Sequence, residues 1–285
     1  MALARFGFMV MLSAGFAPWA GGVAHAAATG WVGDNRVAVR LITATDKLAT
    51  NSTLDAGLEF RFAKGWHGYW RTPGDAGIAP MVDWSGSENI QREEIAWPAP
   101  FRLVIEDLQN SVYANHIVLP VKLFLKETGA PLRIKASVAY AACSNICVPY
   151  QAELTLSLTP AAGGTSAEAA LIDAARKTVP GTPATAGIEV VGVRVSGSAS
   201  ESMLVVELRS SDKPFVRPDL FVEGAGNGIP AAPQVDLGDG GKTARLTVRL
   251  PALPPVGRPL TVTLTDEGRA AEFPVNANVT APRSP

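Results

Sequence analysis

Two stretches of alternating apolar residues constrain the fold of this chain more than any other feature of its sequence. Apolar residues occupy every second position from Leu132 to Tyr140 and again from Leu154 to Leu158. Side chains at a period of two line one face of an extended strand, whereas a helix requires a period near 3.6. The sequence therefore predicts two half-buried strands that are joined by the segment between them.

That connecting segment contains both cysteines of the chain, Cys143 and Cys147. Three residues separate them, so a turn could bring their Cα atoms to the roughly 5.5 Å that a disulfide requires. A bond that closes so short a loop would stabilise the fold by only about 2 kcal/mol in the chain-entropy model. Three interpretations of the pair follow: a redox-active disulfide, a structural disulfide or a metal site.

The first 26 residues have the pattern of a secretory signal peptide. Arg5 supplies a positive charge, residues 6–20 are apolar, and Ala24-His25-Ala26 fits a cleavage site. The apolar run is shorter than the roughly 20 residues that a membrane-spanning helix needs, and no later stretch is long enough. We therefore expect export, cleavage after residue 26 and a mature chain that does not span the membrane, in an oxidising compartment.

The composition favours a folded protein made of β-sandwiches. Of the 25 basic residues, Arg5 is lost with the signal peptide, and the rest face 26 acidic residues, which leaves a net charge of −2. No basic stripe is present, so nucleic acid is excluded as a partner. Short alternating runs among 27 glycines and 22 prolines predict an all-β fold: two immunoglobulin-like β-sandwich domains joined by a short helical linker.

The domain boundaries follow from the linker composition. We predict a first domain over residues 27–162, a helical linker over 163–187, a second sandwich over 188–280 and a tail over 281–285. Thr165 and Glu168 have the spacing of a capping box that opens the linker helix. Because the linker is rich in Gly and Pro at its ends, few contacts should cross it, and we expect the first domain to fold alone.

An aromatic segment from Gly65 to Gly77 is the second notable feature of the first domain. We expect Trp66 and Trp70 to pack into the sandwich core before the Pro73-Gly74 turn. His67 is ambiguous, because a histidine beside aromatic residues is more often packed than catalytic. The second domain contains neither Cys nor His, and its expected role is spacing, docking or stabilising the first.

Four segments of the first domain resemble the N-terminal periplasmic domain of the thiol:disulfide interchange protein DsbD, and most closely its ScsB (suppressor of copper sensitivity) branch. The matching segments are residues 65–77, 95–100, 113–121 and 140–149. The likeness covers most of residues 31–160, and the arrangement of two sandwiches also resembles the ScsB N-terminal region. The combination of motifs is specific, whereas the two cysteines alone would not be.

The resemblance implies an immunoglobulin-like redox domain in the periplasm. In that family the cysteine pair passes reducing equivalents from a membrane electron-transfer partner to thioredoxin-fold proteins, with links to copper tolerance and cytochrome c maturation. By position, Cys147 matches the cysteine that forms mixed disulfides, and Cys143 matches the resolving cysteine. No cofactor is implied, and the electron source is expected to be a separate membrane protein.

Two departures from the family pattern concern the site itself. The best-known DsbD domains place five residues between the cysteines, whereas this chain places three. A family aromatic that shields the disulfide should fall within residues 106–110, and this stretch contains none. Leu108 and Tyr113 are the candidates that remain for this shielding role.

Two other functions are kept beside thiol:disulfide exchange. Two thiolates and a histidine, either His67 or His116, would suit a copper(I) site. A non-catalytic binding module with a structural disulfide is the other alternative, and it would have a reduction potential below roughly −300 mV. Strands on both sides of the cysteines argue against the thioredoxin-like fold in which copper-delivering C-x3-C proteins place their pair.

Overall fold

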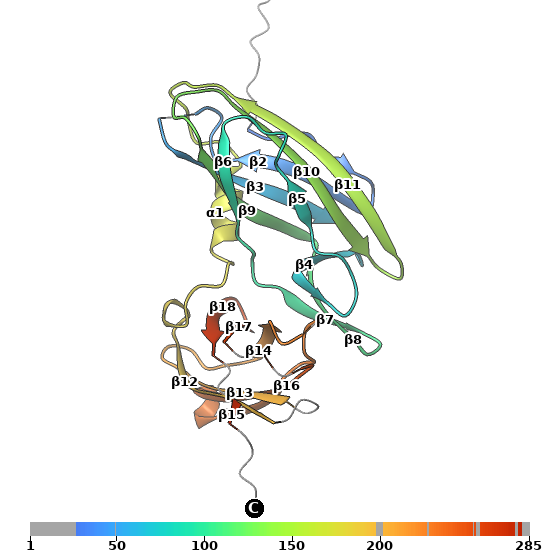
Figure 1. Ribbon diagram of the computed structural model, residues 1–285, viewed down its shortest axis with the longest axis vertical. Helices are drawn as coiled ribbons and strands as arrows, with labels where there is room; N and C mark the ends of the chain where they lie inside the picture. Colours follow the sequence, from blue (N-terminus) through green and yellow to red (C-terminus); the bar gives the residue numbers. More distant parts are fainter. Residues whose placement is uncertain are drawn as a thin grey trace, which may run out of the picture.

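Two β-sandwiches lie one above the other in the computed structural model of this chain, with one α-helix beside the first (Figure 1). The structure describes residues 27–280 apart from 49, 198–201, 227, 253, 255–256 and 277–278. The expected signal peptide and the tail at 281–285 lie outside the described residues. The predicted all-β fold class, with two immunoglobulin-like sandwiches, is confirmed. No helix of the described part is long and apolar enough to cross a membrane.

The first sheet of the first sandwich has the strand order β1-β2-β3-β9-β6, and all of its pairs are antiparallel. Its strands are β1 (Val32–Gly33), β2 (Val37–Thr43), β3 (Thr53–Phe62), β9 (His116–Leu125) and β6 (Ile90–Ile95). Strand β3 is buried on both faces over its middle because the helix covers the side away from the core.

The second sheet has the order β11-β10-β4-β8-β7, with β5 also paired to β10. Its strands are β10 (Leu132–Cys143), β11 (Cys147–Leu158), β4 (His67–Gly74), β5 (Met81–Asp83), β7 (Phe101–Ile105) and β8 (Leu108–Ala114). The two strands predicted on either side of the cysteines are therefore confirmed. Strand β4 pairs with β10 only where His67 faces Cys143, and β5 pairs with β10 further along. Strand β4 thus leaves β10 directly after the cysteine end and runs toward the second sandwich (Figure 1).

The core between these sheets consists of the inward-facing residues of the alternating strands. Trp70 is fully buried in this core, as predicted, whereas Trp66 is only partly buried. The other large side chains that are fully buried in this core are Leu41, Leu58, Leu119, Leu123, Leu132, Ile134, Leu154 and Leu158. Phe221 and Ile229 of the second sandwich belong to the same cluster of buried residues. The two sandwiches therefore share part of one hydrophobic core.

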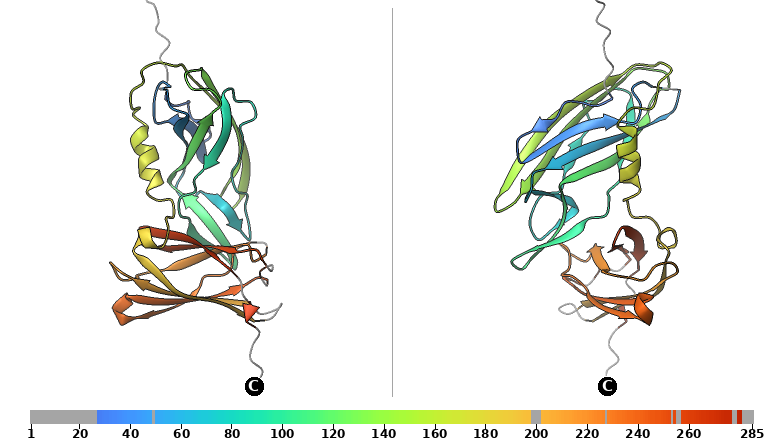
Figure 2. Two further views of the ribbon diagram at one scale, coloured as in Figure 1. Left: turned by 60° about the vertical axis from the view of Figure 1, so that its left-hand side comes forward. Right: turned by 180° about the vertical axis from the view of Figure 1, so that it is seen from behind.

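The linker helix α1 (Ala169–Arg176) packs on the outer face of the first sheet (Figure 2). Ile172 is fully buried there against Ile42 and Val118, and Arg176 donates two hydrogen bonds to Asp55. The predicted capping box does not form. Glu168 occupies the N-cap position without a side-chain hydrogen bond to the helix. The segment before it is held by tertiary contacts that compete with the cap, in particular the bridge between Thr165 and Thr45.

The second sandwich consists of a five-stranded and a three-stranded sheet, with orders β15-β16-β13-β12-β19 and β14-β17-β18. The first of these contains β15 (Gln234–Gly238), β16 (Thr243–Leu250), β13 (Ser202–Ser210), β12 (Ile188–Gly197) and β19 (Val279–Thr280). The second contains β14 (Asp219–Glu223), β17 (Leu260–Asp266) and β18 (Arg269–Val275). The described residues also form the short 3₁₀-helices η1 (Ala184–Ala186) and η2 (Asp239–Gly241).

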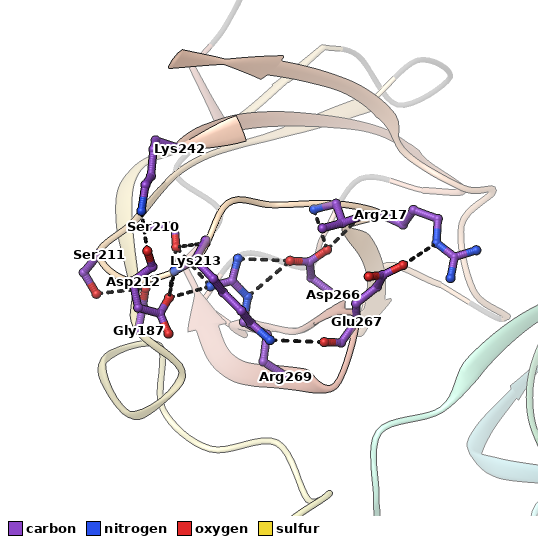
Figure 3. Close-up of polar contacts among 11 residues, drawn as sticks. Gly187, Ser210, Ser211, Asp212, Lys213, Arg217, Lys242, Asp266, Glu267 and Arg269 are labelled. Carbon is purple, nitrogen blue, oxygen red and sulfur yellow. Dashed lines mark hydrogen bonds and ion pairs between the residues drawn. The ribbon is translucent and has the colours of Figure 1, made fainter. Parts of the chain in front are cut away.

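A buried ion pair fixes the end of the second sandwich that faces the linker (Figure 3). Asp266 accepts two hydrogen bonds from Arg269, and both side chains are almost fully buried. The Asp266 carboxylate also accepts the backbone N–H groups of Val216 and Arg217. The carboxylate thereby joins the β13–β14 connection to the β17–β18 hairpin, and both of its oxygen atoms accept hydrogen bonds.

A second buried carboxylate, Glu59 on β3, lies on the helix-covered face of the first sheet. It pairs with Arg40, Arg61 and His116, at distances of 2.6, 3.2 and 2.8 Å. Burial alone raises the pKa of Glu59, but the hydrogen bonds from His116 and Arg40 outweigh it and hold this pKa below its usual value. His116 is thus placed in a structural charge cluster.

Replacing this carboxylate should cost stability in a pH-dependent way. We expect Glu59→Gln to lower the free energy of unfolding at pH 7 by about 2–3 kcal/mol, because the largely buried Arg40 guanidinium loses its charged partner. A lowered pKa gives stability that is present above the unfolded value and lost as the pH falls through the folded value. The difference between variant and parent should therefore shrink below about pH 4. Urea unfolding at pH 7 and at pH 3.5 measures this difference.

The control for this prediction is Glu94→Gln, because Glu94 forms an exposed ion pair with Arg92 on β6. Exposed pairs contribute at most about 1 kcal/mol, so this variant should change little at either pH. A loss for Glu59→Gln that is the same at pH 7 and at pH 3.5 would contradict the prediction.

Candidate functional site

The two cysteines form a disulfide at the tip of the β10–β11 hairpin. The strands pair without a bulge from Leu132 opposite Leu158 to Cys143 opposite Cys147, where the Cα atoms are 4.1 Å apart. A hydrogen bond of 2.9 Å from the Ser144 N–H to the Ile146 carbonyl closes the turn between them. The predicted turn, with one cysteine at each end, is therefore present.

The two cysteines differ sharply in their exposure to solvent. Cys143 is 1 % exposed because it ends an inner strand, between β11 on one side and the start of β4 on the other. Cys147 begins the outermost strand of the sheet and is exposed. Its neighbour Ile146 is 61 % exposed. An incoming thiol group thus finds one half of the bond open and the other half covered.

His67 lies directly beside Cys143. Its backbone is opposite Cys143 in the sheet, and its ring meets the Tyr69 ring edge-to-face at 5.4 Å between centroids. The side chain is buried, its Nε2 atom has no hydrogen-bond partner, and burial lowers its pKa. A buried imidazole with a lowered pKa is neutral at pH 7. The histidine is therefore packed at the site as an uncharged ring.

Tyr69 is the residue whose side chain reaches the exposed cysteine. Its hydroxyl lies 3.7 Å from the Cys147 Sγ, within hydrogen-bonding range for sulfur. The ring is buried in a small cluster with Val112, Ala141 and Cys143, and burial raises the pKa of the hydroxyl. The hydroxyl therefore stays protonated and can donate to a sulfur that becomes negatively charged.

Sequence reasoning did not single out Tyr69, although a signal for it existed. Tyr69 stands two residues after His67, so the two side chains must lie on one face of β4. Gly77 then lies flat against the Tyr69 ring with φ = +99°, and a Cβ atom there would come within 2.1 Å of it. The aromatic segment that carried the family resemblance thus contains Tyr69, which contacts the disulfide, and Gly77, which packs against the Tyr69 ring.

Neither Leu108 nor Tyr113, the two candidates for shielding the disulfide, lies in the cluster around Cys143. Leu108 is exposed at the start of β8. Tyr113 is buried in the main core, and its hydroxyl donates a 2.6 Å hydrogen bond to the Pro98 carbonyl. The apolar side chain that packs against the Cys143 cluster from the β7–β8 hairpin is Leu103.

No group of three or more His, Cys, Asp and Glu side chains among the described residues could hold a metal ion. His67 and His116 lie on different sheets, and His116 is bound to Glu59. The arrangement around the cysteines is thus a disulfide with a tyrosine hydroxyl and a neutral imidazole beside it.

The comparisons with known proteins agree with this geometry. Residues 38–159 match the family model of the N-terminal domain of thiol:disulfide interchange protein DsbD, and residues 178–280 match a domain of unknown function. The structure is similar to the crystal structure of the N-terminal periplasmic domain of ScsB from Proteus mirabilis, with a TM-score of 0.70 and 22 % identity. The similarity covers 88 % of this chain and 99 % of that one. No curated protein matches the chain.

The first sandwich therefore defines the class, an immunoglobulin-like domain with a disulfide at a hairpin tip. Residues 38–159 of this sandwich, less than half of the chain, are similar to the DsbD N-terminal family of thiol:disulfide interchange proteins.

Proposed function

We propose that the chain is a periplasmic thiol:disulfide exchange protein in which Cys143 and Cys147 are the redox-active pair. It takes reducing equivalents from a separate membrane electron-transfer protein and passes them to thioredoxin-fold proteins. Copper tolerance and cytochrome c maturation are the processes in which we expect such a carrier to act. The observation that carries the proposal is the unequal exposure of the two cysteines in a domain of this family.

The unequal exposure supports different roles for the two sulfurs. In the reduced protein the Cys147 thiolate attacks the partner's disulfide, and a mixed disulfide forms as one partner sulfur leaves as a thiolate. The Cys143 thiol then loses its proton and attacks Cys147 Sγ, which re-forms the internal disulfide and releases the second partner thiolate. The partner gains two electrons and two protons, and this chain loses the same. The membrane partner reverses these steps.

The roles are tested by trapping the mixed disulfide. We expect Cys143→Ala to accumulate a covalent complex with an oxidised thioredoxin-fold protein, because Cys147 stays exposed and no second thiol resolves the complex. Cys147→Ala should trap at least about tenfold less, because Cys143 is buried. Non-reducing gel electrophoresis with mass spectrometry of the product measures both. Equal trapping by the two variants would refute the assignment.

A redox titration separates this function from that of a structural disulfide. In glutathione buffers the pair of the unmodified chain should change between oxidised and reduced at an accessible potential, whereas structural bridges lie below roughly −300 mV. A pair that stays oxidised in every buffer would exclude the exchange function.

A further inference from the structure

Both elements that form the wall of the redox site, strand β4 and the β7–β8 hairpin, rest on the second sandwich. Figures 1 and 2 show them at the lower end of the first sandwich, next to strand β14. Strand β4 carries His67 and Tyr69, and the hairpin supplies Leu103 and Val112 to the cluster around Cys143. The second sandwich therefore contacts both elements that carry these side chains.

The first anchor holds the end of β4. Arg71 donates hydrogen bonds to Glu223 of β14 through both Nε and Nη2, and it also pairs with Glu272 of β18. The hydroxyl of Thr72 donates to the same Glu223 carboxylate. The neighbouring Trp70 ring meets Phe221 edge-to-face at 5.9 Å between centroids. A partly buried carboxylate thus fixes two consecutive residues of the strand that carries Tyr69.

The second anchor holds β7. The Arg102 guanidinium is only 7 % exposed and forms two hydrogen bonds with the Asp219 carboxylate, of 2.9 and 3.0 Å. It also donates to the backbone carbonyls of Pro230 and Leu220. Such a forked, desolvated contact fixes orientation as well as distance. The hairpin next to the redox site is therefore positioned by the second sandwich.

The loop that follows Thr72 connects the two anchors and packs against Tyr69. After Thr72 the chain forms a loop in which the Asp75 N–H donates to the Gln109 carbonyl and the Gln109 N–H donates to the Asp75 carboxylate. The same loop places Gly77 against the Tyr69 ring. Glu223 thus holds one end of this covering loop, and the hairpin that Arg102 anchors holds its middle.

We propose that the second sandwich is a positioning element of the redox site: Glu223 and Asp219 hold β4, the covering loop and the β7–β8 hairpin so that the Tyr69 hydroxyl stays against the Cys147 sulfur. Glu223 and Asp219 do not touch the sulfur and act through Tyr69. The inference rests on the proposed exchange function for its biological purpose, but its physical content concerns the Cys147 sulfur alone.

The consequence appears when the disulfide is reduced. A thiolate accepts a hydrogen bond far better than a neutral thiol, so a fixed Tyr69 hydroxyl stabilises the reactive form of Cys147. Losing one charge-assisted hydrogen bond should raise the pKa of the Cys147 thiol by about one unit. The thiolate fraction at pH 7 would fall about tenfold. Because a more basic thiolate is about threefold more nucleophilic, the reaction rate would fall by only about threefold.

The test measures the pKa of Cys147 without any protein partner. In the mature full-length chain with Cys143→Ala, the rate of iodoacetamide alkylation is followed from pH 5 to 10. We expect Glu223→Gln and Tyr69→Phe each to raise the pKa by about one unit and to slow alkylation at pH 7 about threefold. The double variant should show no larger shift than either single variant, because both changes remove the same hydrogen bond.

The control is Glu207→Gln, since Glu207 of β13 pairs with Arg245 of β16 and Arg194 of β12 within the second sandwich. It should leave the pKa of Cys147 unchanged. A folded Glu223→Gln variant with the parent's pKa overturns the proposal, and so does a full additional shift on the Tyr69→Phe background. If Glu223→Gln fails to fold, Thr72→Val is used instead, because this variant removes one hydrogen bond to Glu223 and keeps the Arg71–Glu223 ion pair. An unchanged pKa of Cys147 in Thr72→Val also overturns the proposal.

The outcome is independent of the exchange function. Alkylation reports the state of the Cys147 sulfur, whereas trapping with a thioredoxin-fold protein reports the exchange itself. A shifted pKa of Cys147 without trapping would support the positioning role and refute the proposed function. Trapping without a shifted pKa would support the proposed function and refute the positioning role.

Discussion

A fragment that ends at residue 162 is expected to be unfolded or to lack fixed tertiary structure. It lacks Ile172 of helix α1, which is fully buried on the first sheet. It also lacks Phe221 and Ile229, which complete the core of the first sandwich. Removing a single buried Phe or Ile side chain costs about 2–5 kcal/mol. The three together approach or exceed the 5–15 kcal/mol by which a typical domain is stable.

This expectation replaces the one based on the linker composition, in which residues 27–162 fold alone. Gly and Pro at the ends of the linker do mark a flexible connection, but they say nothing about contacts that form elsewhere between the two sandwiches. Those contacts start from β4 and β7, far from the linker in sequence. The seam also covers Trp70, which is fully buried in the complete chain.

The measurement compares the fragments 27–162 and 27–180 with the chain 27–285 by near-ultraviolet circular dichroism and urea unfolding. Fragment 27–180 retains helix α1 and should recover part of the stability. A cooperative transition of fragment 27–162 within about 2 kcal/mol of the complete chain would contradict the prediction, because the loss of three buried side chains should exceed that value.

The alternating pattern was sufficient to predict the all-β fold class and the two strands on either side of the cysteines. The two predicted strands are present as β10 and β11, and the cysteines stand at the two ends of the predicted turn. These features depend on a local pattern, because the period of two and the turn between two strands are both readable along the chain.

The capping box failed because tertiary contacts override a local pattern. The hydroxyl of Ser166 donates to a strand carbonyl, and the chain before the helix follows the sheet.

The charged residues of the seam gave no sequence signal at all. Arg71 and Arg102 are isolated basic residues in strands, and nothing near them indicates that each faces a carboxylate more than a hundred residues later. Tyr69 shares a face of β4 with His67, which is a local signal, but its contact with Cys147 links residues that lie 78 positions apart. Such pairings exist only once the sheets are assembled, so a single sequence could not predict them.

A second large effect is expected at the buried ion pair of the second sandwich. We expect Asp266→Ala to lower the free energy of unfolding by about 3–5 kcal/mol, because it leaves the buried Arg269 guanidinium and two backbone N–H groups without their acceptor. For a chain of this size that corresponds to a fall of roughly 10 °C in Tm. The matched control is Glu189→Ala, which breaks an exposed pair with Arg209 and should cost less than about 1 kcal/mol.

Tryptophan fluorescence makes this prediction a test of coupling between the sandwiches. Every tryptophan of the mature chain lies before residue 98, so the fluorescence reports only the first sandwich, whereas Asp266 lies in the second. Because Phe221, Arg71 and Arg102 join the two across the seam, the fluorescence transition of Asp266→Ala should shift together with the far-ultraviolet circular dichroism transition. A fluorescence midpoint that stays at the parent's value while the circular dichroism shows an earlier transition would mean that the second sandwich unfolds separately, and its contacts would then be too weak to hold β4 and the β7–β8 hairpin in position.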